Sequence, residues 1–387
     1  MELNERLNNE LDNRKLINSY RELKVIKDKV DFSSNDYLGF AQNEDLKSNI
    51  INKIKKIPGI GSGGSRLLTG NNIQIEILEK EVAEFHMAPA ALFFNSGYEA
   101  NSGLISTITK RNDTIIYDEL IHASLREGIR LSNAQFFSFR HNDLIDLEIK
   151  LQKTVGEKFV IIESVYSMDG DLARLNEIVS ITKRYKSNII LDEAHATGVI
   201  GNKGEGLAQH LELQGKIFAR VHTCGKAIGN NGAFVLGSDT LKNYLINFCR
   251  PFIYSTAPNL MQVIAVAEGY RFLKEAGQLV AGLKENCIYF KQQIARFKNI
   301  QLLPSASAIF SILIPGNEAV KLAANYLQNE NFDIRPILSP TVAEGSERLR
   351  VCIHSFNTKQ EIDELISFLE NLAEMPANRK LELGIRN

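Results

Sequence analysis

The chain carries the apolar run Ile189-Ile190-Leu191, which ends directly in Asp192-Glu193-Ala194-His195. A second apolar run, Ile217-Phe218-Ala219-Arg220-Val221, is soon followed by Thr223-Cys224-Gly225-Lys226-Ala227. Short, apolar or β-branched runs of this kind predict buried strands of a parallel sheet. Open sheets of this class hold their ligands at the carboxyl ends of the strands. We therefore expect both polar clusters at the ligand-binding edge of one sheet.

The side chains in these two clusters indicate a particular chemistry. A lysine can form a covalent link to an aldehyde cofactor, and a carboxylate can keep a basic ring nitrogen of that cofactor protonated. Lys226 and Asp192 are of these two types. A charged group after a strand is common, so either cluster alone would be weak evidence. Together they favour a cofactor that has both an aldehyde and a pyridine-type nitrogen.

Composition and charge narrow the class of protein. A length of 387 residues with 44% hydrophobic content predicts two to three globular domains. The 45 basic and 46 acidic residues nearly cancel, which argues against a polyanionic partner such as nucleic acid. The cysteines are widely spaced without a CxxC pair, so neither a zinc site nor a disulfide framework is expected. With no apolar leader and no membrane-length apolar stretch, we expect a soluble, cytoplasmic protein.

Strand and helix signals alternate through the middle of the chain. Strands are predicted at 90–94, 114–117, 159–162, 189–191, 217–221 and 232–236, with helices between them, including 45–57 and 73–85. This alternation predicts right-handed crossovers and a mainly parallel sheet. A long helical region is expected from 261 to 297, followed by strands at 308–314, 332–336 and 348–353 and helices at 317–329 and 358–373.

These signals divide the chain into three predicted parts. Residues 1–44 form an N-terminal arm, helical to about residue 30, with Leu3, Leu7 and Leu11 spaced as on an amphipathic helix. Residues 45–275 form a large α/β domain, and residues 276–387 form a small α+β domain.

A turn after the first strand of the large domain is suited to bind phosphate. Asn95-Ser96-Gly97-Tyr98 leads into a helix, whose free N–H groups and positive dipole end attract anions. Tyr98 and, after the next strand, His122 are aromatic side chains that could pack on a cofactor ring. The glycine-rich stretch 59–66 matches GxGxxG, but no strand precedes it, so we expect a substrate-side loop rather than a dinucleotide site.

Three other classes of protein were weighed. Asp192-Glu193-Ala194-His195 matches the Walker B motif of helicase-type ATPases, but the chain has no Walker A motif to hold the phosphates. A metallohydrolase is disfavoured because there is no HExxH or similar ligand cluster, and no metal is expected. A non-catalytic scaffold would not need acid, imidazole and amine groups together at strand ends.

Several ordered motifs give a family resemblance over nearly the whole chain. They are Ser34-Asn-Asp-Tyr-Leu-Gly39, Gly61-Ser-Gly-Gly-Ser65-Arg66, Ser96-Gly-Tyr98, His122-Ala-Ser124, Ser167-Met-Asp-Gly-Asp171, Asp192-Glu-Ala-His195-Ala-Thr-Gly198, Thr223-Cys-Gly-Lys226-Ala and Arg348-Leu-Arg350. The chain resembles the α-oxoamine synthases, which are pyridoxal 5'-phosphate (PLP) enzymes with the aspartate aminotransferase-like fold (fold type I). The resemblance implies a homodimer with active sites at the interface.

The resemblance also implies a reaction. Members of this family condense an amino acid with an acyl thioester and release CO₂. The motifs are most similar to the branch that joins L-alanine to pimeloyl-CoA, or to a pimeloyl carrier protein, in biotin biosynthesis. A glycine C-acetyltransferase and a serine-using long-chain synthase remain as alternatives.

Residue roles follow from the same resemblance. Lys226 is implied to link covalently to PLP, Asp192 to pair with the ring nitrogen, His195 to contact the phenolic oxygen, and His122 to stack on the ring. The other implied contacts are Gly97, Tyr98, Ser167 and Thr223 to the cofactor, Arg21, Asn35, Thr341 and Arg350 to substrate, and Ser255 and Thr256 to the partner subunit's phosphate.

Overall fold

The structure is a computed structural model that describes residues 2–25, 28–57 and 59–374. The chain forms two compact units. The large unit holds Asn35–Ser167 and Asp171–Gly282, and the small unit holds Met1–Ser34, Met168–Gly170 and Leu283–Asn387. The predicted boundaries of the three parts, at residues 44 and 275, stay a prediction. Residues 1, 26–27, 58 and 375–387 of those parts lie outside the described part of the chain.

A seven-stranded sheet forms the centre of the large unit, in the order β2-β8-β7-β6-β5-β3-β4. Its strands are β2 (Ala90–Phe94), β3 (Thr114–Asp118), β4 (Gln135–Phe139), β5 (Lys158–Glu163), β6 (Asn188–Asp192), β7 (Ala219–Thr223) and β8 (Ala233–Gly237). Strands β7, β6, β5, β3 and β4 pair in parallel, while β8 pairs antiparallel with both of its neighbours. The predicted mainly parallel sheet is confirmed, with β8 as its one reversed strand.

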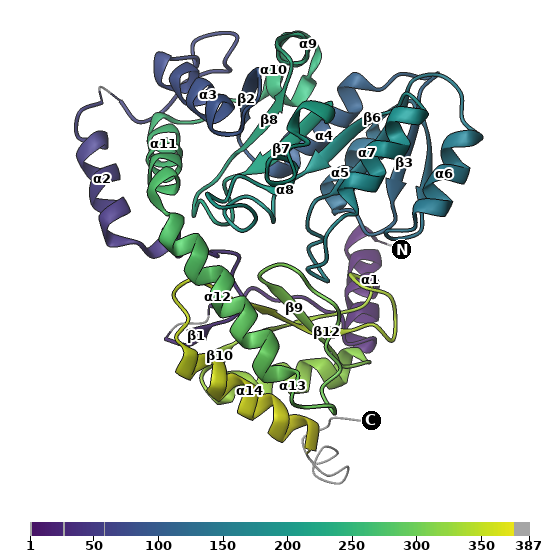
Figure 1. Ribbon diagram of the computed structural model, residues 1–387, viewed down its shortest axis with the longest axis vertical. Coiled ribbons are helices and arrows are strands. Elements are labelled where there is room, and N and C mark those ends of the chain that lie inside the picture. Colours follow the sequence, from purple (N-terminus) through teal and green to yellow (C-terminus); the bar gives the residue numbers. More distant parts are fainter. Residues whose placement is uncertain (1, 26–27, 58, 375–387) are drawn as a thin grey trace. The chain divides into compact units, whose positions relative to one another are not determined.

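Helices surround this sheet, as Figure 1 shows for α4 to α7. The helices of the unit are α2 (Glu44–Ile54), α3 (Ile73–Phe85), α4 (Gly97–Ile108), α5 (Ala123–Leu131), α6 (Leu144–Gln152), α7 (Leu175–Arg184), α8 (Leu207–His210), α9 (Asp239–Phe248), α10 (Arg250–Tyr254) and α11 (Leu260–Glu275), with short 3₁₀ turns at Phe40–Gln42 and Gln214–Lys216. Cover on both faces explains why the central strands are apolar throughout rather than alternating.

The register of the parallel strands aligns their carboxyl ends. Glu163, the last residue of β5, pairs with Asp192, the last residue of β6, and Asp192 pairs with Val221 of β7. β7 ends two residues later, at Thr223. The predicted placement of both polar clusters at strand ends is therefore confirmed.

The small unit contains two sheets. β1 (Val30–Asp31) pairs in parallel with β10 (Phe332–Asp333), and β12 (Arg348–Cys352) lies antiparallel between β11 (Arg335–Ile337) and β9 (Ile309–Leu313). Its helices are α1 (Leu3–Leu16), α13 (Asn317–Asn329), α14 (Lys359–Glu374) and most of α12 (Gly277–Ile294). The strands predicted at 308–314 and 348–353 and the helices predicted at 317–329 and 358–373 are present within a few residues. The single strand predicted at 332–336 is wrong, because β10 and β11 are separate strands that pair in different sheets.

Two helix predictions were wrong in extent. The N-terminal helix ends at Leu16 rather than near residue 30, and Leu3, Leu7 and Leu11 are all exposed. The long helical region predicted from 261 to 297 is two helices, α11 and α12, separated at Ala276. Side-chain periodicity does not register such a break, because the apolar face continues across it.

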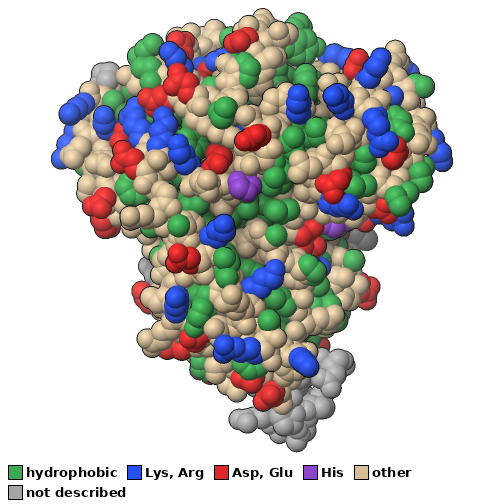
Figure 2. Space-filling view, viewed as in Figure 1, with side chains coloured by type: hydrophobic (Ala, Val, Ile, Leu, Met, Phe, Trp, Pro, Cys, Tyr) green, Lys and Arg blue, Asp and Glu red, His purple; other side chains and the backbone are tan. Residues whose placement is uncertain are grey.

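The surface carries both signs of charge. Figure 2 shows Lys and Arg side chains interspersed with Asp and Glu over the visible face, in keeping with the net charge of −1. Within the described residues, no helix is both long and apolar enough to cross a membrane.

A buried histidine pair lies inside the large unit. The rings of His86 and His222 lie 3.8 Å apart between centroids, and both residues are fully buried. The Thr197 hydroxyl donates to the Glu193 carbonyl oxygen and so accepts from Nδ1–H of His222, at 2.9 Å in each case. Burial lowers the pKa of both imidazoles well below the usual value, so the rings are neutral in the folded protein.

This pair should make the protein sensitive to acid. Because the folded pKa values are lowered, the unfolded chain binds more protons below about pH 6.5, and the free energy of unfolding falls there by up to about 1.4 kcal/mol per pH unit for each histidine. Urea unfolding measured between pH 5 and 8 tests this expectation. His222→Asn keeps a donor near Thr197 but removes one titrating group, so the slope below pH 6.5 should flatten.

The matched control for that measurement is the exposed His210, replaced by Asn. It should leave the slope unchanged. An equal slope in the wild-type protein and in His222→Asn would contradict a neutral, buried His222.

Candidate active site

Asp192 and Lys226 lie at the predicted edge of the sheet. Asp192 is 5% exposed, and its two carboxylate oxygens accept hydrogen bonds from the Ala194 N–H at 2.8 Å and the Asn101 amide at 2.7 Å. Each oxygen keeps a further lone pair that can accept from a ligand. The half-buried Lys226 places its Nζ 3.4 Å from Oγ1 of Thr223.

The predicted phosphate turn lies against the lysine segment. A Cβ atom at Gly97 would come within 2.6 Å of Cγ2 of Thr223, so only glycine allows this close approach of α4 to the end of β7. Ser96 caps α4 by accepting the Glu99 N–H at 3.1 Å. The N–H groups of the first helical turn have no partners within the helix, so an anion can bind beside Thr223.

His122 is fixed through both its main chain and its ring. Its backbone N–H donates to the Glu163 carboxyl at 2.5 Å, and its Nδ1 lies 2.8 Å from Oγ of Ser124. Loss of water around part of the ring lowers the pKa of His122, while nearby Asp192 raises it and Lys226 lowers it. His122 therefore belongs to the same site as Asp192 and Lys226, and its ring is accessible to a ligand.

His195 is linked to the motif at residues 34–39. Its Nδ1 lies 2.8 Å from the hydroxyl of Tyr37, which is fully buried and donates to Oδ1 of Asn35 at 3.2 Å. The large unit thus brings the predicted substrate residue Asn35 close to His195. The predicted cofactor residue Ser167 is buried in the turn after β5, and Tyr98 is half exposed on the first turn of α4.

The other predicted substrate residues belong to the small unit. The exposed Arg21 and Thr341 are 320 positions apart in sequence, yet Nη2 of Arg21 donates to Oγ1 of Thr341 at 3.1 Å. Arg350 lies on the central strand β12 of the three-stranded sheet, 9% exposed, and its Nη1 is 3.1 Å from Sγ of Cys352.

Four residues of this site were not assigned a role from the sequence. They are Tyr37, Asn101, Ser124 and Glu163. Tyr37 and Ser124 lie within motifs that carry the family resemblance, and this placement could have marked them as site residues. Nothing in the local pattern distinguishes Asn101 or Glu163 from an ordinary residue of a buried helix or strand end.

Glu163 adds a second buried carboxyl group beside Asp192. Burial raises the pKa of Glu163 well above the usual value, and the neighbouring charge of Asp192 raises it further. The hydrogen bond from the His122 N–H and the charge of Lys226 lower this pKa, but their effects are smaller than that of burial. Two adjacent buried carboxyl groups cannot both ionise at low cost. Glu163 therefore holds a proton to higher pH than an ordinary glutamate, because its pKa is raised.

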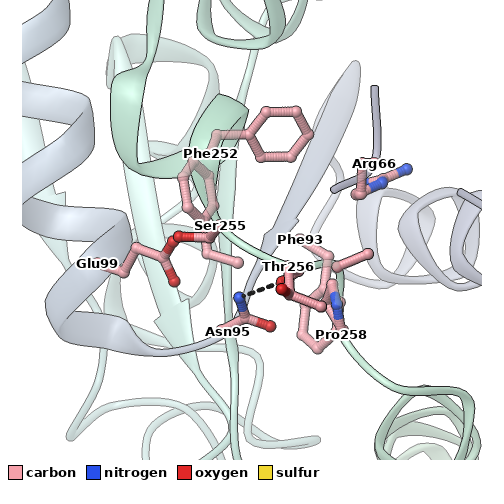
Figure 3. Close-up of a pocket in the computed structure, with 10 residues that line it drawn as sticks. Arg66, Phe93, Asn95, Glu99, Phe252, Ser255, Thr256 and Pro258 are labelled. Atoms are coloured by element: carbon pink, nitrogen blue, oxygen red, sulfur yellow. Dashed lines mark hydrogen bonds between the residues drawn. The ribbon is translucent and has the colours of Figure 1, made fainter. Parts of the chain in front are cut away.

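A small hollow lies beside the phosphate turn. It encloses about 210 Å³, part of it open solvent, and Asn95 is one of its lining residues. Figure 3 shows the Asn95 amide pointing to the Thr256 carbonyl oxygen, to which it donates at 3.0 Å. Arg66, Glu99 and Ser255 are among its other lining residues. Ser255 and Thr256, which the resemblance assigns to a partner's phosphate, thus lie close to this chain's own turn at Asn95.

Comparisons with known proteins agree with this architecture. A family model described as aminotransferase class I and II matches residues 27–369. The 8-amino-7-oxononanoate synthase of Lysinibacillus sphaericus is 40% identical over 346 residues, which cover 89% of this chain and 88% of that protein.

Two solved structures are similar over most of their length. A serine palmitoyltransferase variant from S. paucimobilis, with bound PLP–myriocin aldimine, has a TM-score of 0.90 at 25% identity and covers 100% of both chains. The 8-amino-7-oxononanoate synthase from Francisella tularensis has a TM-score of 0.77 at 29% identity, over 92% of this chain and 99% of that one. The fold is thus the aspartate aminotransferase-like fold (fold type I) predicted from the sequence. The chain belongs to the aminotransferase class I and II family, in the group that contains the 8-amino-7-oxononanoate synthases.

Proposed function

We propose that this protein is a PLP-dependent C-acyltransferase that makes 8-amino-7-oxononanoate for biotin biosynthesis. The reaction forms a bond between Cα of L-alanine and the carbonyl carbon of a pimeloyl thioester. It expels the thiol of coenzyme A or of a carrier protein and releases the alanine carboxyl group as CO₂. One observation carries the proposal: hydrogen bonds connect Asp192 to His122 through Asn101 and Ser124, at the sheet edge where β7 leads to Lys226, in a chain 40% identical to an enzyme of that name.

The residues of the site are suited to PLP. The Lys226 amine would hold the cofactor's aldehyde carbon, the Asp192 carboxylate its ring nitrogen, and the turn at Gly97 beside Thr223 its phosphate. When bound, PLP supplies an electron-poor ring that stabilises negative charge at the amino acid's Cα. Tyr98 and Ser167 complete the proposed cofactor contacts.

Side chains of this protein would move protons of the substrate and bind atoms of the PLP ring. The Lys226 amine would remove the Cα proton of alanine, and a base placed in this way contributes about 10²–10⁴-fold in rate. His195, oriented by Tyr37 through Nδ1, is the proposed partner of the phenolic oxygen. The raised pKa of Glu163 favours its neutral form, which places no second negative charge beside Asp192.

Substrate contacts are proposed in each unit separately. In the small unit, Arg350 would bind the alanine carboxylate, because its planar guanidinium can donate two hydrogen bonds to a carboxylate. In the large unit, Asn35 is proposed as a substrate contact. Arg21 and Thr341 would contact the acyl donor side. Their mutual hydrogen bond supports the assignment of both residues to one subsite.

We also propose a homodimer that acts in the cytoplasm. The first part rests on the resemblance to the α-oxoamine synthases, in which Ser255 and Thr256 match positions that reach the partner subunit's phosphate. Four cysteines without a disulfide support a reducing compartment.

The substrates are tested by a matrix of amino acids and acyl-CoA thioesters. PLP-loaded protein is incubated with L-alanine, glycine or L-serine, each with pimeloyl-, acetyl- or palmitoyl-CoA, and products are identified by mass spectrometry. We expect 8-amino-7-oxononanoate from L-alanine with pimeloyl-CoA as the dominant product. Lys226→Ala should abolish it, and replacement of the exposed Lys216 by Ala should not.

Two results of that matrix would contradict the proposal. Product formed only from glycine with acetyl-CoA would make the protein a glycine C-acetyltransferase. Product formed only from L-serine with palmitoyl-CoA would make it a long-chain synthase.

The protonation of Glu163 can be measured directly. In a pH titration, the infrared C=O band of a protonated carboxyl group that is lost in Glu163→Gln should persist to higher pH than the band of an ordinary glutamate, because burial and Asp192 raise the pKa of Glu163. Replacement of the exposed Glu212 by Gln should leave the band in place. Identical difference spectra for the two variants would rule out a neutral Glu163.

A further inference from the structure

We propose that Asn101 is a positioning residue that holds Asp192 and His122 in a fixed mutual arrangement and, through Ser124, keeps the His122 proton on Nε2. This inference rests on the proposed function for its catalytic meaning. Its structural basis is a hydrogen-bonded chain that crosses three elements of the large unit: β6, α4 and the start of α5.

The hydrogens in this chain can be accounted for one by one. The Asn101 amide has two N–H groups, and its Nδ2 lies 2.7 Å from Oδ2 of Asp192 and 3.0 Å from Oγ of Ser124. A carboxylate only accepts, so one N–H points to Asp192 and the other to Ser124. Because the Ser124 oxygen accepts from Asn101, its own hydroxyl hydrogen is available for Nδ1 of His122, 2.8 Å away.

A second donor acts on the same ring nitrogen. The backbone N–H of Ser124 donates to Nδ1 of His122 at 3.2 Å. Nδ1 is therefore an acceptor for two donors, so the neutral ring carries its hydrogen on Nε2. This arrangement stabilises the neutral imidazole, in agreement with the lowered pKa of His122. The charged groups near the ring are Asp192 and Lys226, with the Glu163 carboxyl on the backbone N–H.

The orientation of the Asn101 amide is dictated by its partners. Its carbonyl oxygen Oδ1 is buried and has no hydrogen-bond partner among the described residues. Rotating the amide by half a turn would satisfy neither acceptor, since Oδ1 would then face the Asp192 carboxylate. The amide thus leaves its oxygen buried and unsatisfied, while both N–H groups bond to Asp192 and Ser124. A buried oxygen without a partner costs free energy, and the two hydrogen bonds offset this cost.

Packing makes the connection rigid. Asn101 and Ser124 are 2% and 1% exposed, so the bonds between them do not compete with bulk water. Helices α4 and α5 approach closely at Gly128. A Cβ atom there would lie 3.0 Å from Cα of Ser102 and 3.1 Å from the main-chain carbonyl oxygen of Asn101. A movement of either helix would therefore displace Asp192 and His122 together.

The test compares Asn101→Asp and Ser124→Ala with the wild-type protein. Asn101→Asp has nearly the same shape but replaces two donors by acceptors. Ser124→Ala removes only the hydroxyl link to His122. Ser106→Ala is the matched control, since the Ser106 hydroxyl bonds only within α4.

The first readout is ¹⁵N NMR of histidine-labelled protein without PLP, with the His122 signals assigned through His122→Gln. We expect the Nε2–H form in the wild type and the control. Ser124→Ala should raise the pKa of His122 by about 0.5–1 pH unit, the equivalent of one lost hydrogen bond to the neutral ring. Asn101→Asp should raise it further and mix the two neutral forms.

The second readout is PLP affinity, followed by visible absorption during titration. Asn101→Asp should weaken binding about 10- to 100-fold, because a carboxylate then faces Asp192. An Nδ1–H form in the wild type, or His122 signals in both variants identical to those of Ser106→Ala, would overturn the proposal. If Asn101→Asp does not fold, Ser124→Ala alone decides. Failure of the wild type to bind PLP would instead contradict the proposed function, because the NMR result needs no cofactor.

Discussion

The pairing register of β5, β6 and β7 is the constraint on which the candidate active site depends. It aligns Glu163 with Asp192 and ends β7 at Thr223, so that polar side chains from separate strands meet at one edge of the sheet. A slip of one residue would turn Asp192 to the opposite face and bury its carboxylate in the apolar layer between sheet and helices. The apolar run Ile189–Leu191 of β6 opposes such a slip, because its residues must stay buried while Asp192 must lie where hydrogen-bond partners are available.

The helices after these strands complete the site by close approach. Gly97 brings the first turn of α4 against Thr223, and Asn101 on the same helix donates to Asp192. A single rigid element thus sets both the phosphate end and the ring-nitrogen end of the proposed PLP site. The spacing between those two ends is then independent of the position of the Lys226 side chain, which suits the proposed role of Lys226 in both holding a cofactor and moving a proton.

Much of this was accessible from the sequence. Apolar runs that end in Asp192 or lead to Lys226 predicted the strand ends, because burial on both faces requires such runs. Periodicity could not reveal that β8 runs antiparallel, since an apolar strand has the same pattern in either direction. The edge strand β4 was not predicted, because its exposed Phe136 and Phe137 do not resemble a buried run. Contacts between distant positions, such as Tyr37 with His195 or β1 with β10, are set by tertiary packing alone.

The central claim is that Lys226 is the residue to which PLP becomes attached. The most direct test is borohydride reduction of the PLP-incubated protein, followed by digestion and peptide mass spectrometry. We expect one pyridoxyl group per chain, on the peptide that contains Lys226, and none on that peptide in Lys226→Ala. A label confined to another lysine, or no label on wild-type protein, would contradict it.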